Sequence, residues 1–229
     1  MRAIFVAALL TLSGCAGAFG ERAHQTIHQA IASSAVPLVR VENVAGTVRI
    51  EGWHKSVVDV EATKYGYDAD QLRNIEVEVR NEGSGVSIAT NYLARTSNGG
   101  VRYKIFVPAG ASLRVGNVAG MVDIAGVGGN VDVETQAGAI RADLGRVAGD
   151  RSIDLRATTG AIRVYVAPGS SARVDAASTV GAFSSDLPGI SESRENLVGS
   201  RASGAIGAGS ALIRMTTTTG AIALGERGL

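Results

Sequence analysis

The feature that most constrains this chain is a short apolar alternation, centred on a glycine, that recurs along the sequence. In the clearest copy, around Gly160, apolar residues lie seven and five positions before the glycine and two and four positions after it: Ile153, Leu155, Ile162 and Val164. The frame also fits Gly46, Gly120, Gly138 and Gly220, and more loosely Gly181 and Gly204. Alternation of period two indicates strands with one buried face, so each copy predicts two β-strands that meet at a glycine corner.

The spacing of the copies predicts how these strands are arranged. From Gly120 onward the glycines follow one another at intervals of 18, 22, 21, 23 and 16 residues. Periods near 20 residues are typical of β-solenoids, in which each repeat is one coil. At ~3.3 Å per residue, such a coil has a perimeter of about 66 Å, enough for three short faces. We therefore predict an all-β chain that folds as a single-stranded β-helix with coils of about 20 residues.

The domain organisation follows from where this spacing is kept. We expect a solenoid domain over residues 36–229, with regular coils over residues 108–229. Residues 51–107 interrupt the spacing with longer alternating stretches, such as 57–63 and 86–92. This β-rich insertion is expected to cap or flank the coils, because a stacked array must protect its exposed edge. The last copy ends close to Leu229 with no evident cap, so self-association through an open edge is possible.

The N-terminal residues predict export. Arg2 precedes an apolar run, residues 3–11, that is shorter than the ~20 residues of a membrane-spanning helix and is typical of a secretion signal. The following residues, Leu12-Ser13-Gly14-Cys15, resemble the lipobox of bacterial lipoproteins. That resemblance implies cleavage before Cys15, the only cysteine, and acylation of its thiol. Residues 1–14 are then a lipoprotein signal peptide and residues 15–35 a lipid-anchored tether.

A second cleavage site lies just beyond the first. The small residues Ala16-Gly17-Ala18 fit ordinary signal peptidase, and cleavage after Ala18 would discard Cys15 and release an unanchored protein. The lipobox is the more specific pattern. We therefore expect an exported cell-envelope protein anchored by lipid to a bacterial membrane. Ala16 directly after the cysteine, where an aspartate would signal retention, resembles outer-membrane sorting in Gram-negative bacteria.

The charges give no indication of a nucleic-acid partner. Lys and Arg number 22 and Asp and Glu 21, which leaves a net charge of +1 and no basic excess to attract phosphates. The charged residues of the copies fall at outward positions of the strands. Exposed ion pairs of this kind contribute little to stability, so we expect them to serve solubility and edge protection.

Candidate metal ligands are few. His24 and His28 are four residues apart, a spacing that could place two ligands on one helix face. No glutamate follows His24 to complete a zinc-protease motif, and no third ligand is evident. His54, beside Trp53, is expected on the surface. We predict no metal site and no cofactor.

Candidate catalytic residues are limited to carboxylates. Asp132, Asp143 and Asp154 could stack on adjacent coils, and paired carboxylates are the catalytic groups of enzymes that cleave polysaccharides. Arg141 and Arg156 are interleaved with them, and aromatic residues that could stack on sugars make up only 4% of the chain. We predict no catalytic residues, and a carbohydrate-active enzyme remains the less favoured alternative.

The glycine-centred repeats resemble those of a bacterial family of β-strand-repeat proteins known as putative adhesins. The resemblance rests on residues 44–50 with Glu51-Gly52-Trp53, and on residues 219–224. It covers residues 36–229 and implies a single-stranded β-helix, an envelope location and no agreed catalytic residues. We expect a non-enzymatic envelope lipoprotein that presents a β-solenoid surface to a protein or glycan partner. The alternative is a self-associating envelope scaffold.

Overall fold

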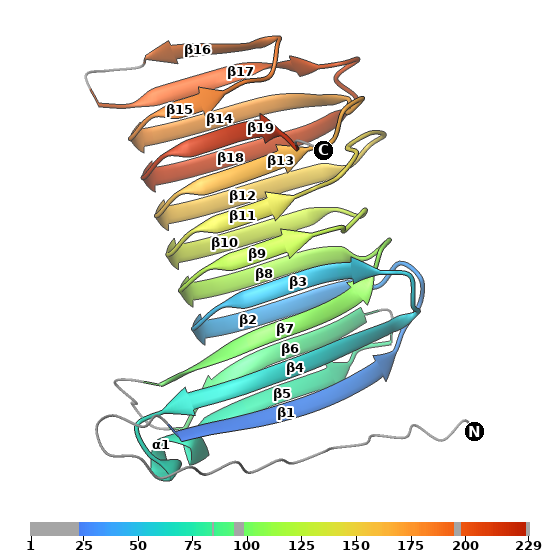
Figure 1. Ribbon diagram of the computed structural model, residues 1–229, viewed down its shortest axis with the longest axis vertical. Helices are drawn as coiled ribbons and strands as arrows, with labels where there is room; N and C mark the ends of the chain where they lie inside the picture. The colour runs from blue at the N-terminus through green and yellow to red at the C-terminus, as the bar shows by residue number, and fades with distance from the viewer. Residues whose placement is uncertain (1–22, 84, 94–98, 195–197, 228–229) are drawn as a thin grey trace.

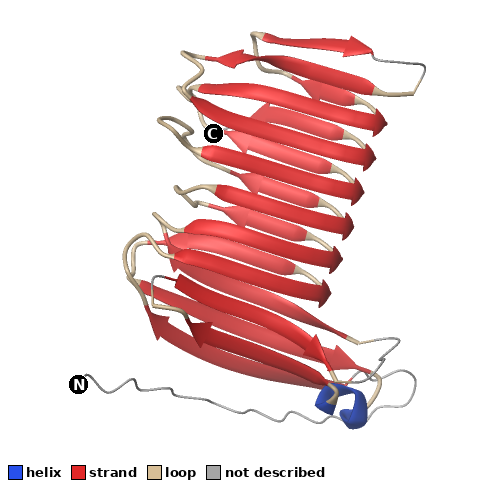
Figure 2. Ribbon diagram, turned by 180° about the vertical axis from the view of Figure 1, so that it is seen from behind, coloured by secondary structure: helices blue, strands red, loops and turns tan. Residues whose placement is uncertain are grey.

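The computed structural model describes residues 23–83, 85–93, 99–194 and 198–227. These residues form two mixed sheets, one of nine strands and one of ten. The sheets lie face to face, and their strands are stacked along the long axis of the molecule (Figures 1 and 2). The prediction of an all-β chain is confirmed. The three faces expected from the coil perimeter are wrong, because part of each period, such as residues 144–151, forms a loop and contributes no third strand.

Every glycine-centred copy except that of Gly204 contributes one strand to each sheet. The first strands lie in the ten-stranded sheet: β2 (Leu38–Ala45), β8 (Ser112–Ala119), β10 (Val131–Ala137), β12 (Ser152–Thr159), β14 (Ala172–Val180) and β18 (Ala211–Thr219). The second strands lie in the nine-stranded sheet: β3 (Val48–Trp53), β9 (Val122–Ala125), β11 (Ile140–Asp143), β13 (Ile162–Val166), β15 (Phe183–Ser185) and β19 (Ile222–Glu226).

Neighbouring copies pair in parallel, with equivalent positions side by side. In the ten-stranded sheet, Val131 of β10 is aligned with Leu113 of β8 on one side and with Ile153 of β12 on the other. The nine-stranded sheet follows the same rule across β9, β11 and β13. Equivalent side chains of successive copies therefore form straight columns across each sheet.

The copies are not stacked in sequence order. β18 lies between β12 and β14, and β19 lies between β13 and β15. The C-terminal copy is thus an interior layer, and the predicted open edge at that end is wrong. The four-position frame determines which side chains face inward, but it is the same in every copy and carries no information on their order.

The segment between the first two copies forms one end of the stack. Its elements are β4 (Val57–Gly66), α1 (Ala69–Arg73), β5 (Ile75–Asn81), β6 (Gly85–Tyr92) and β7 (Gly100–Pro108). β6 and β7 pair in parallel with β2 and β3 and so add one more layer. β5 and β4 then pair antiparallel with β6 and β7 and lie outside that layer.

The tether predicted over residues 15–35 is partly a strand. β1 (Ala23–Ala32) pairs antiparallel with β4 along its whole length and is an edge of the nine-stranded sheet. Its inward positions alternate glutamine and isoleucine, so apolar residues recur every four positions and the period-two signal was hidden. Residues 15–22 lie outside the described residues.

An antiparallel hairpin forms the other end of the stack. β17 (Ser200–Ile206) pairs with β14, and β16 (Ile190–Arg194) pairs with β17. Gly204 lies within β17, opposite Val174 and Ile190, so the copy predicted around it is wrong. The lack of a side chain at Gly204 lets the backbone of Gly189 approach closely, since a Cβ on Gly204 would lie 2.1 Å from the carbonyl oxygen of Gly189.

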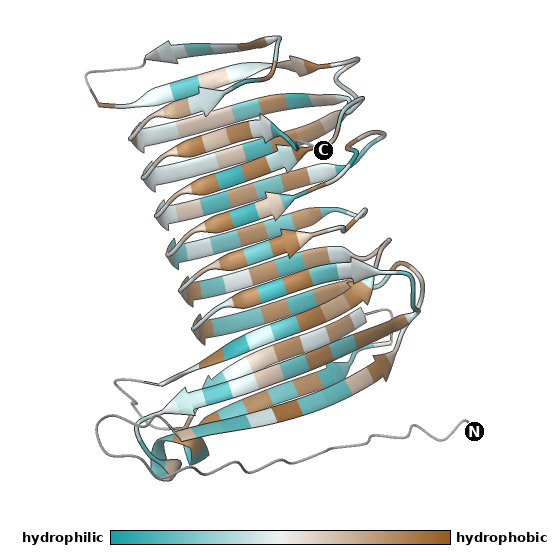
Figure 3. Cartoon of the chain, viewed as in Figure 1, coloured by the Kyte–Doolittle hydropathy of each residue, from teal (hydrophilic) through white to brown (hydrophobic). Residues whose placement is uncertain are grey.

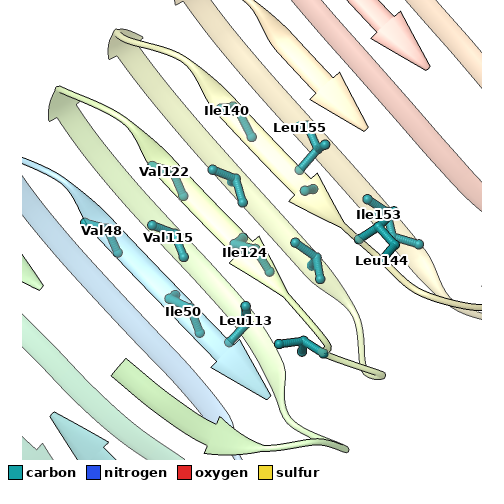
Figure 4. Packing of buried hydrophobic residues seen from close by; sticks show 14 of the residues in the cluster. Val48, Ile50, Leu113, Val115, Val122, Ile124, Ile140, Leu144, Ile153 and Leu155 are labelled. Atoms are coloured by element: carbon teal, nitrogen blue, oxygen red, sulfur yellow. The ribbon is translucent and has the colours of Figure 1, made fainter. Parts of the chain in front are cut away.

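The hydrophobic core is the space between the two sheets. Alternate residues of each strand point into it, as the banded colouring of Figure 3 and the sticks of Figure 4 show. Ile153, Leu155 and Ile162 are fully buried and Val164 is 1% exposed, which confirms the inward positions predicted around Gly160. Burying each such side chain stabilises the fold by about 1.5–3 kcal/mol.

The corners form a column of glycines between the sheets. In spatial order the column is Gly46, Gly120, Gly138, Gly160, Gly220 and Gly181. Five of them have positive φ, between 123° at Gly46 and 151° at Gly181 and Gly220. The column follows the spatial order of the strands, so Gly220 stands between Gly160 and Gly181.

Candidate functional site

The outward face of the ten-stranded sheet carries one row of charged residues in register. In spatial order the row consists of Arg40, Arg114, Asp132, Asp154, Arg214 and Asp175. Arg114 Nε lies 3.4 Å from Asp132 Oδ2, and Arg214 Nη1 lies 3.8 Å from Asp154 Oδ2. Exposed pairs of this kind contribute well under ~1 kcal/mol each. The row therefore determines how charge is distributed over this face, and it contributes little to the stability of the fold.

Two of the three candidate carboxylates lie together. Asp132 and Asp154 are direct neighbours on β10 and β12. The Arg156 guanidinium lies 3.5 Å from the first carboxylate and 2.6 Å from the second. Asp143 lies in the other sheet, on β11, where its carboxylate is 2.6 Å from Arg227 Nη1. The predicted stack of three acids is therefore wrong, because Asp143 belongs to the second strand of its copy.

A depression interrupts the charged face at Gly116. Its neighbours in register are Glu42 on β2 and Glu134 on β10, and the Glu42 carboxylate lies over Gly116, where a Cβ would be 2.2 Å from Glu42 Oε2. These residues line an open hollow of about 270 Å³. Arg114 and Asp132 also line the hollow. Burial, with a smaller effect from the charge of Glu134, raises the pKa of Glu42, and Arg114 opposes this shift. The hollow thus places three carboxylates and one guanidinium around a space large enough for a side chain or a sugar ring.

Apolar residues border the same hollow. Val118 lines it, and Val44 occupies the equivalent position on the neighbouring strand, between the aligned pairs Asn43–Asn117 and Ala45–Ala119. Both valines are 40% exposed, although valine is usually buried. The hollow therefore offers charged and apolar contacts side by side, a mixture that suits a protein or glycan surface.

Two further depressions lie toward the hairpin end of the stack. One, of about 170 Å³, is on the same sheet and is lined by Asp175, Arg201 and Arg214 among others. The other, of about 360 Å³, is on the nine-stranded sheet beside Tyr165, Asp186 and Gly225. All three hollows are open depressions on strand faces, so the protein can contact a surface at several points.

The nine-stranded sheet carries an aromatic pair on its outer face. Trp53 and Phe106 stack with ring centroids 5.1 Å apart and planes inclined by 18°. Lys55 Nζ lies 4.5 Å from the Trp53 ring centroid, and Lys104 Nζ lies 5.1 Å from that of Phe106. The indole N–H of Trp53 donates to the Val57 carbonyl oxygen. The rings thus use part of their surface on each other and on two ammonium groups.

The histidines are not arranged as metal ligands on a helix. His24 and His28 lie on strand β1, where four residues span about 13 Å, too far for both imidazoles to bind one ion. His28 Nε2 is 2.5 Å from Asp59 Oδ1, and His54 is exposed beyond the end of β3. Among the described residues, no group of three or more His, Cys, Asp or Glu side chains could hold a metal ion.

The predicted lipidation site, Cys15, and the predicted signal peptide, residues 1–14, lie outside the described residues. In the part of the chain that the structure describes, no helix is long and apolar enough to cross a membrane.

Sequence reasoning missed the hollow at Gly116 and the acids around it. The signal was present: the outward positions of residues 112–119 are polar or large except at Gly116, where the alternation has no side chain. The neighbours of Gly116 come from residues 42 and 134, so no local pattern could have joined them. Trp53 and Phe106 were likewise separated in sequence and joined only by the pairing of β3 with β7.

Comparison with known proteins identifies the fold. No protein-family model and no curated protein sequence matches the chain. A solved structure described as a "putative cell adhesion protein" from Clostridium sporogenes superposes with a TM-score of 0.66 at 11% identity, over 90% of this chain and 100% of that one. The two chains share a fold.

Two further solved structures align less well. A "putative adhesin" from Bacteroides fragilis gives a TM-score of 0.33 at 12% identity, over 87% of this chain and 96% of its own. Another "putative adhesin", from Parabacteroides merdae, gives 0.25 at 9% identity, over 89% and 96%. Superpositions this poor support no detailed comparison.

Proposed function

We propose that this protein is a non-enzymatic, adhesin-like component of the bacterial cell envelope that binds a protein or glycan partner along the outward face of the ten-stranded sheet. The observation that carries the proposal is the in-register charged row together with the hollow at Gly116 and its exposed valines. The shared fold with a protein described as a "putative cell adhesion protein" supports it. Extended, shallow faces of stacked strands suit contact along a surface better than enclosure of a small molecule.

The proposal includes a β-helical interpretation of the fold. In six copies the chain passes from the ten-stranded sheet to the nine-stranded sheet at one glycine, and after four of them, those of Gly120, Gly138, Gly160 and Gly181, it returns directly through a loop. Each passage is one turn of a flattened single-stranded β-helix with two faces. One turn is out of order, since the last one inserts between two earlier ones.

The proposal also includes the lipid anchor at Cys15, on the outer membrane. β1 begins at Ala23, so a tether of eight residues, at most about 29 Å long, would join the lipid to the edge of the sheet. The β1 end of the stack would then face the membrane, and the β16–β17 hairpin would be farthest from it (Figure 1). Both outward faces would remain accessible along the stack.

The anchor is tested by fractionation of cells that express the chain with and without Cys15→Ala. We expect the parent to incorporate labelled fatty acid and to sediment with outer membranes, and the variant to do neither. A variant that fractionates with membranes as the parent does would show that Cys15 is not the anchor.

The binding face is tested by exchanging the charges of one ion pair. The double variant Arg114→Asp with Asp132→Arg keeps the net charge and an ion pair beside the hollow but reverses the charge pattern. The matched control, Arg49→Asp with Asp123→Arg, does the same on the nine-stranded sheet, where Arg49 Nε lies 3.3 Å from Asp123 Oδ2. We expect the first exchange to lower binding to bacterial envelope fractions at least tenfold and the control to leave it unchanged.

The same binding assay distinguishes a protein partner from a glycan partner. Protease treatment of the envelope fraction removes binding if the partner is a protein, and periodate oxidation removes it if the partner is a glycan. Equal binding by both charge exchanges would exclude the ten-stranded face as the binding surface. Cleavage of envelope polysaccharide that disappears in Asp132→Ala or Asp154→Ala would overturn the non-enzymatic assignment.

A further inference from the structure

The two sheets end in four edge strands: β1 and β15 in the nine-stranded sheet, and β5 and β16 in the ten-stranded sheet. An edge strand exposes unpaired backbone N–H and C=O groups, and proteins protect such edges with short strands, charged residues or proline. Three of the four edges are protected in this way. β15 has three residues, β16 has five and includes Glu192, and β5 carries Glu76, Glu78 and Arg80.

The fourth edge, β1, has none of these protections. It is ten residues long, and all ten pair with β4 in an unbroken register from Ala23 opposite Gly66 to Ala32 opposite Val57. Its sequence contains no Asp, Glu, Lys, Arg, Pro or Gly. Among the described residues, no strand pairs with its other side. β1 is therefore a long, regular and uncharged edge, the kind that accepts another strand.

Helix α1 lies at one end of this edge strand. α1 contacts β1 and lies beside its beginning, as both ribbon views show (Figures 1 and 2). The rest of β1 runs away from the helix (Figures 1 and 2). An added strand could pair there with the seven residues centred on Gln29, Thr26–Ala32.

The side chains of this segment are self-complementary. The sequence repeats as His24-Gln25-Thr26-Ile27 and His28-Gln29-Ala30-Ile31. Inward positions, which are opposite Ala62, Val60 and Val58 of β4, are Ile27, Gln29 and Ile31. In an antiparallel pairing of two such segments with Gln29 opposite Gln29, each Ile27 faces an Ile31. Matched aliphatic and amide pairs across strands are favourable, and no charge faces a like charge.

We propose that β1 is a homotypic interface: two copies of this chain pair antiparallel through Thr26–Ala32, with Gln29 on the two-fold axis. The pairing joins the two nine-stranded sheets into one continuous sheet and removes both unprotected edges. It is isologous, so the assembly closes at two copies and does not grow into a filament. Contact along one strand buries less than a standard interface, so the dimer forms reversibly with concentration.

The test uses the chain from residue 15 onward with Cys15→Ala, which retains every described element because the first begins at Ala23. Sedimentation equilibrium between about 1 and about 200 µM is expected to show a monomer–dimer transition. Gln29→Lys places two ammonium groups opposite each other on the axis and is expected to abolish the dimer. Ala30→Lys, at an exposed position of β1, is expected to weaken it at least tenfold without disturbing the core.

Thr158→Lys is the matched control, because Thr158 is exposed on the interior strand β12. It should dimerise as the parent does, and circular dichroism should be the same for all four proteins. In the same cysteine-free background, Gln29→Cys should form a covalent dimer with a short thiol cross-linker, whereas Thr158→Cys should not.

Three results would overturn the proposal. They are a monomer at every concentration, a dimer that persists in both lysine variants of β1, and a loss of dimer that is equal in Thr158→Lys. A folding defect in Gln29→Lys leaves Ala30→Lys and the cross-linking result to decide.

Discussion

Gly220 stands directly against Gly160, although a whole copy and a hairpin separate them in the chain. A Cβ built on Gly220 would lie 2.0 Å from the carbonyl oxygen of Gly160, and one built on Gly160 would lie 1.7 Å from that of Gly138. Real Cβ atoms do not approach a backbone oxygen so closely. The last copy can therefore insert beside the earlier ones only because the corner residue of each has no side chain.

The glycine column predicts an asymmetry between alanine substitutions. Gly160→Ala combines a positive φ of 148° with a backbone clash, and we expect it to lower the free energy of unfolding by at least about 3 kcal/mol. Gly145→Ala also introduces a side chain at positive φ, but nothing lies within 4 Å, so we expect a loss of only about 1 kcal/mol. Denaturant unfolding of the two variants measures the difference. Equal losses of stability in the two variants would mean that backbone strain at positive φ, and not the clash with the neighbouring carbonyl oxygen, dominates the cost of Gly160→Ala.

The interior position of the last copy predicts that the C-terminus is indispensable. Removing residues 211–229 takes β18 and β19 from between neighbouring strands and uncovers both sides of the gap. We expect a chain truncated after residue 210 to lose cooperative thermal unfolding, whereas the end of a simple repeat array would be trimmed with a smaller effect. Hydrogen exchange of the intact chain gives an independent check. Amides of β18 should exchange more slowly than those of the terminal strand β16.

The buried hydroxyl of Tyr103 predicts a loss of stability at high pH. Burial raises the pKa of Tyr103 to about 12, and the hydroxyl lies 2.7 Å from Thr90 Oγ1, which in turn donates to Asn43. The unfolded chain ionises this group near pH 10. The raised pKa therefore adds stability that is fully present below about pH 10 and is lost as the pH rises toward 12.

This loss can be measured against a variant that cannot ionise. Between pH 9 and pH 11 the difference in the pKa of Tyr103 between the unfolded and folded chains should lower the free energy of unfolding by about 1.4 kcal/mol, the value of one pKa unit. Tyr103→Phe should be less stable than the parent at pH 9, because it removes the hydrogen bond, and should lose less on going to pH 11. A parallel decline in both proteins would assign the pH effect to other groups.

We predict that the half-buried guanidinium of Arg151 has a structural role. It donates hydrogen bonds to the carbonyl oxygens of Val127, Gly129, Leu144 and Arg146, in the loops that return the chain to the ten-stranded sheet. Burial lowers its pKa. We expect Arg151→Ala to cost about 1–3 kcal/mol, because several carbonyl groups lose their donor at once. Arg163→Ala, at an exposed position of β13, should cost less than about 0.5 kcal/mol, and thermal unfolding of both compares them.

The inward side chains of the regular copies were predictable, and the irregular ends were not. The alternation around Gly46, Gly120, Gly138, Gly160 and Gly220 follows directly from the two-residue period of a strand. The strand β1 escaped prediction because glutamines occupy two of its five inward positions. The copy at Gly204 was misjudged because an antiparallel hairpin and a parallel turn can share the same short spacing of apolar residues.

The sequence by itself determined that this chain is all-β, which residues face the core and where the corners lie, because these properties depend on neighbours a few residues apart. Only the tertiary structure decided the order of the layers, the hollow at Gly116 and the unprotected edge at β1. These depend on which strands pair across long distances in the chain. Since every copy offers nearly the same inward pattern, pairing is chosen by the fit of whole strands and corners, and no local signal records that choice.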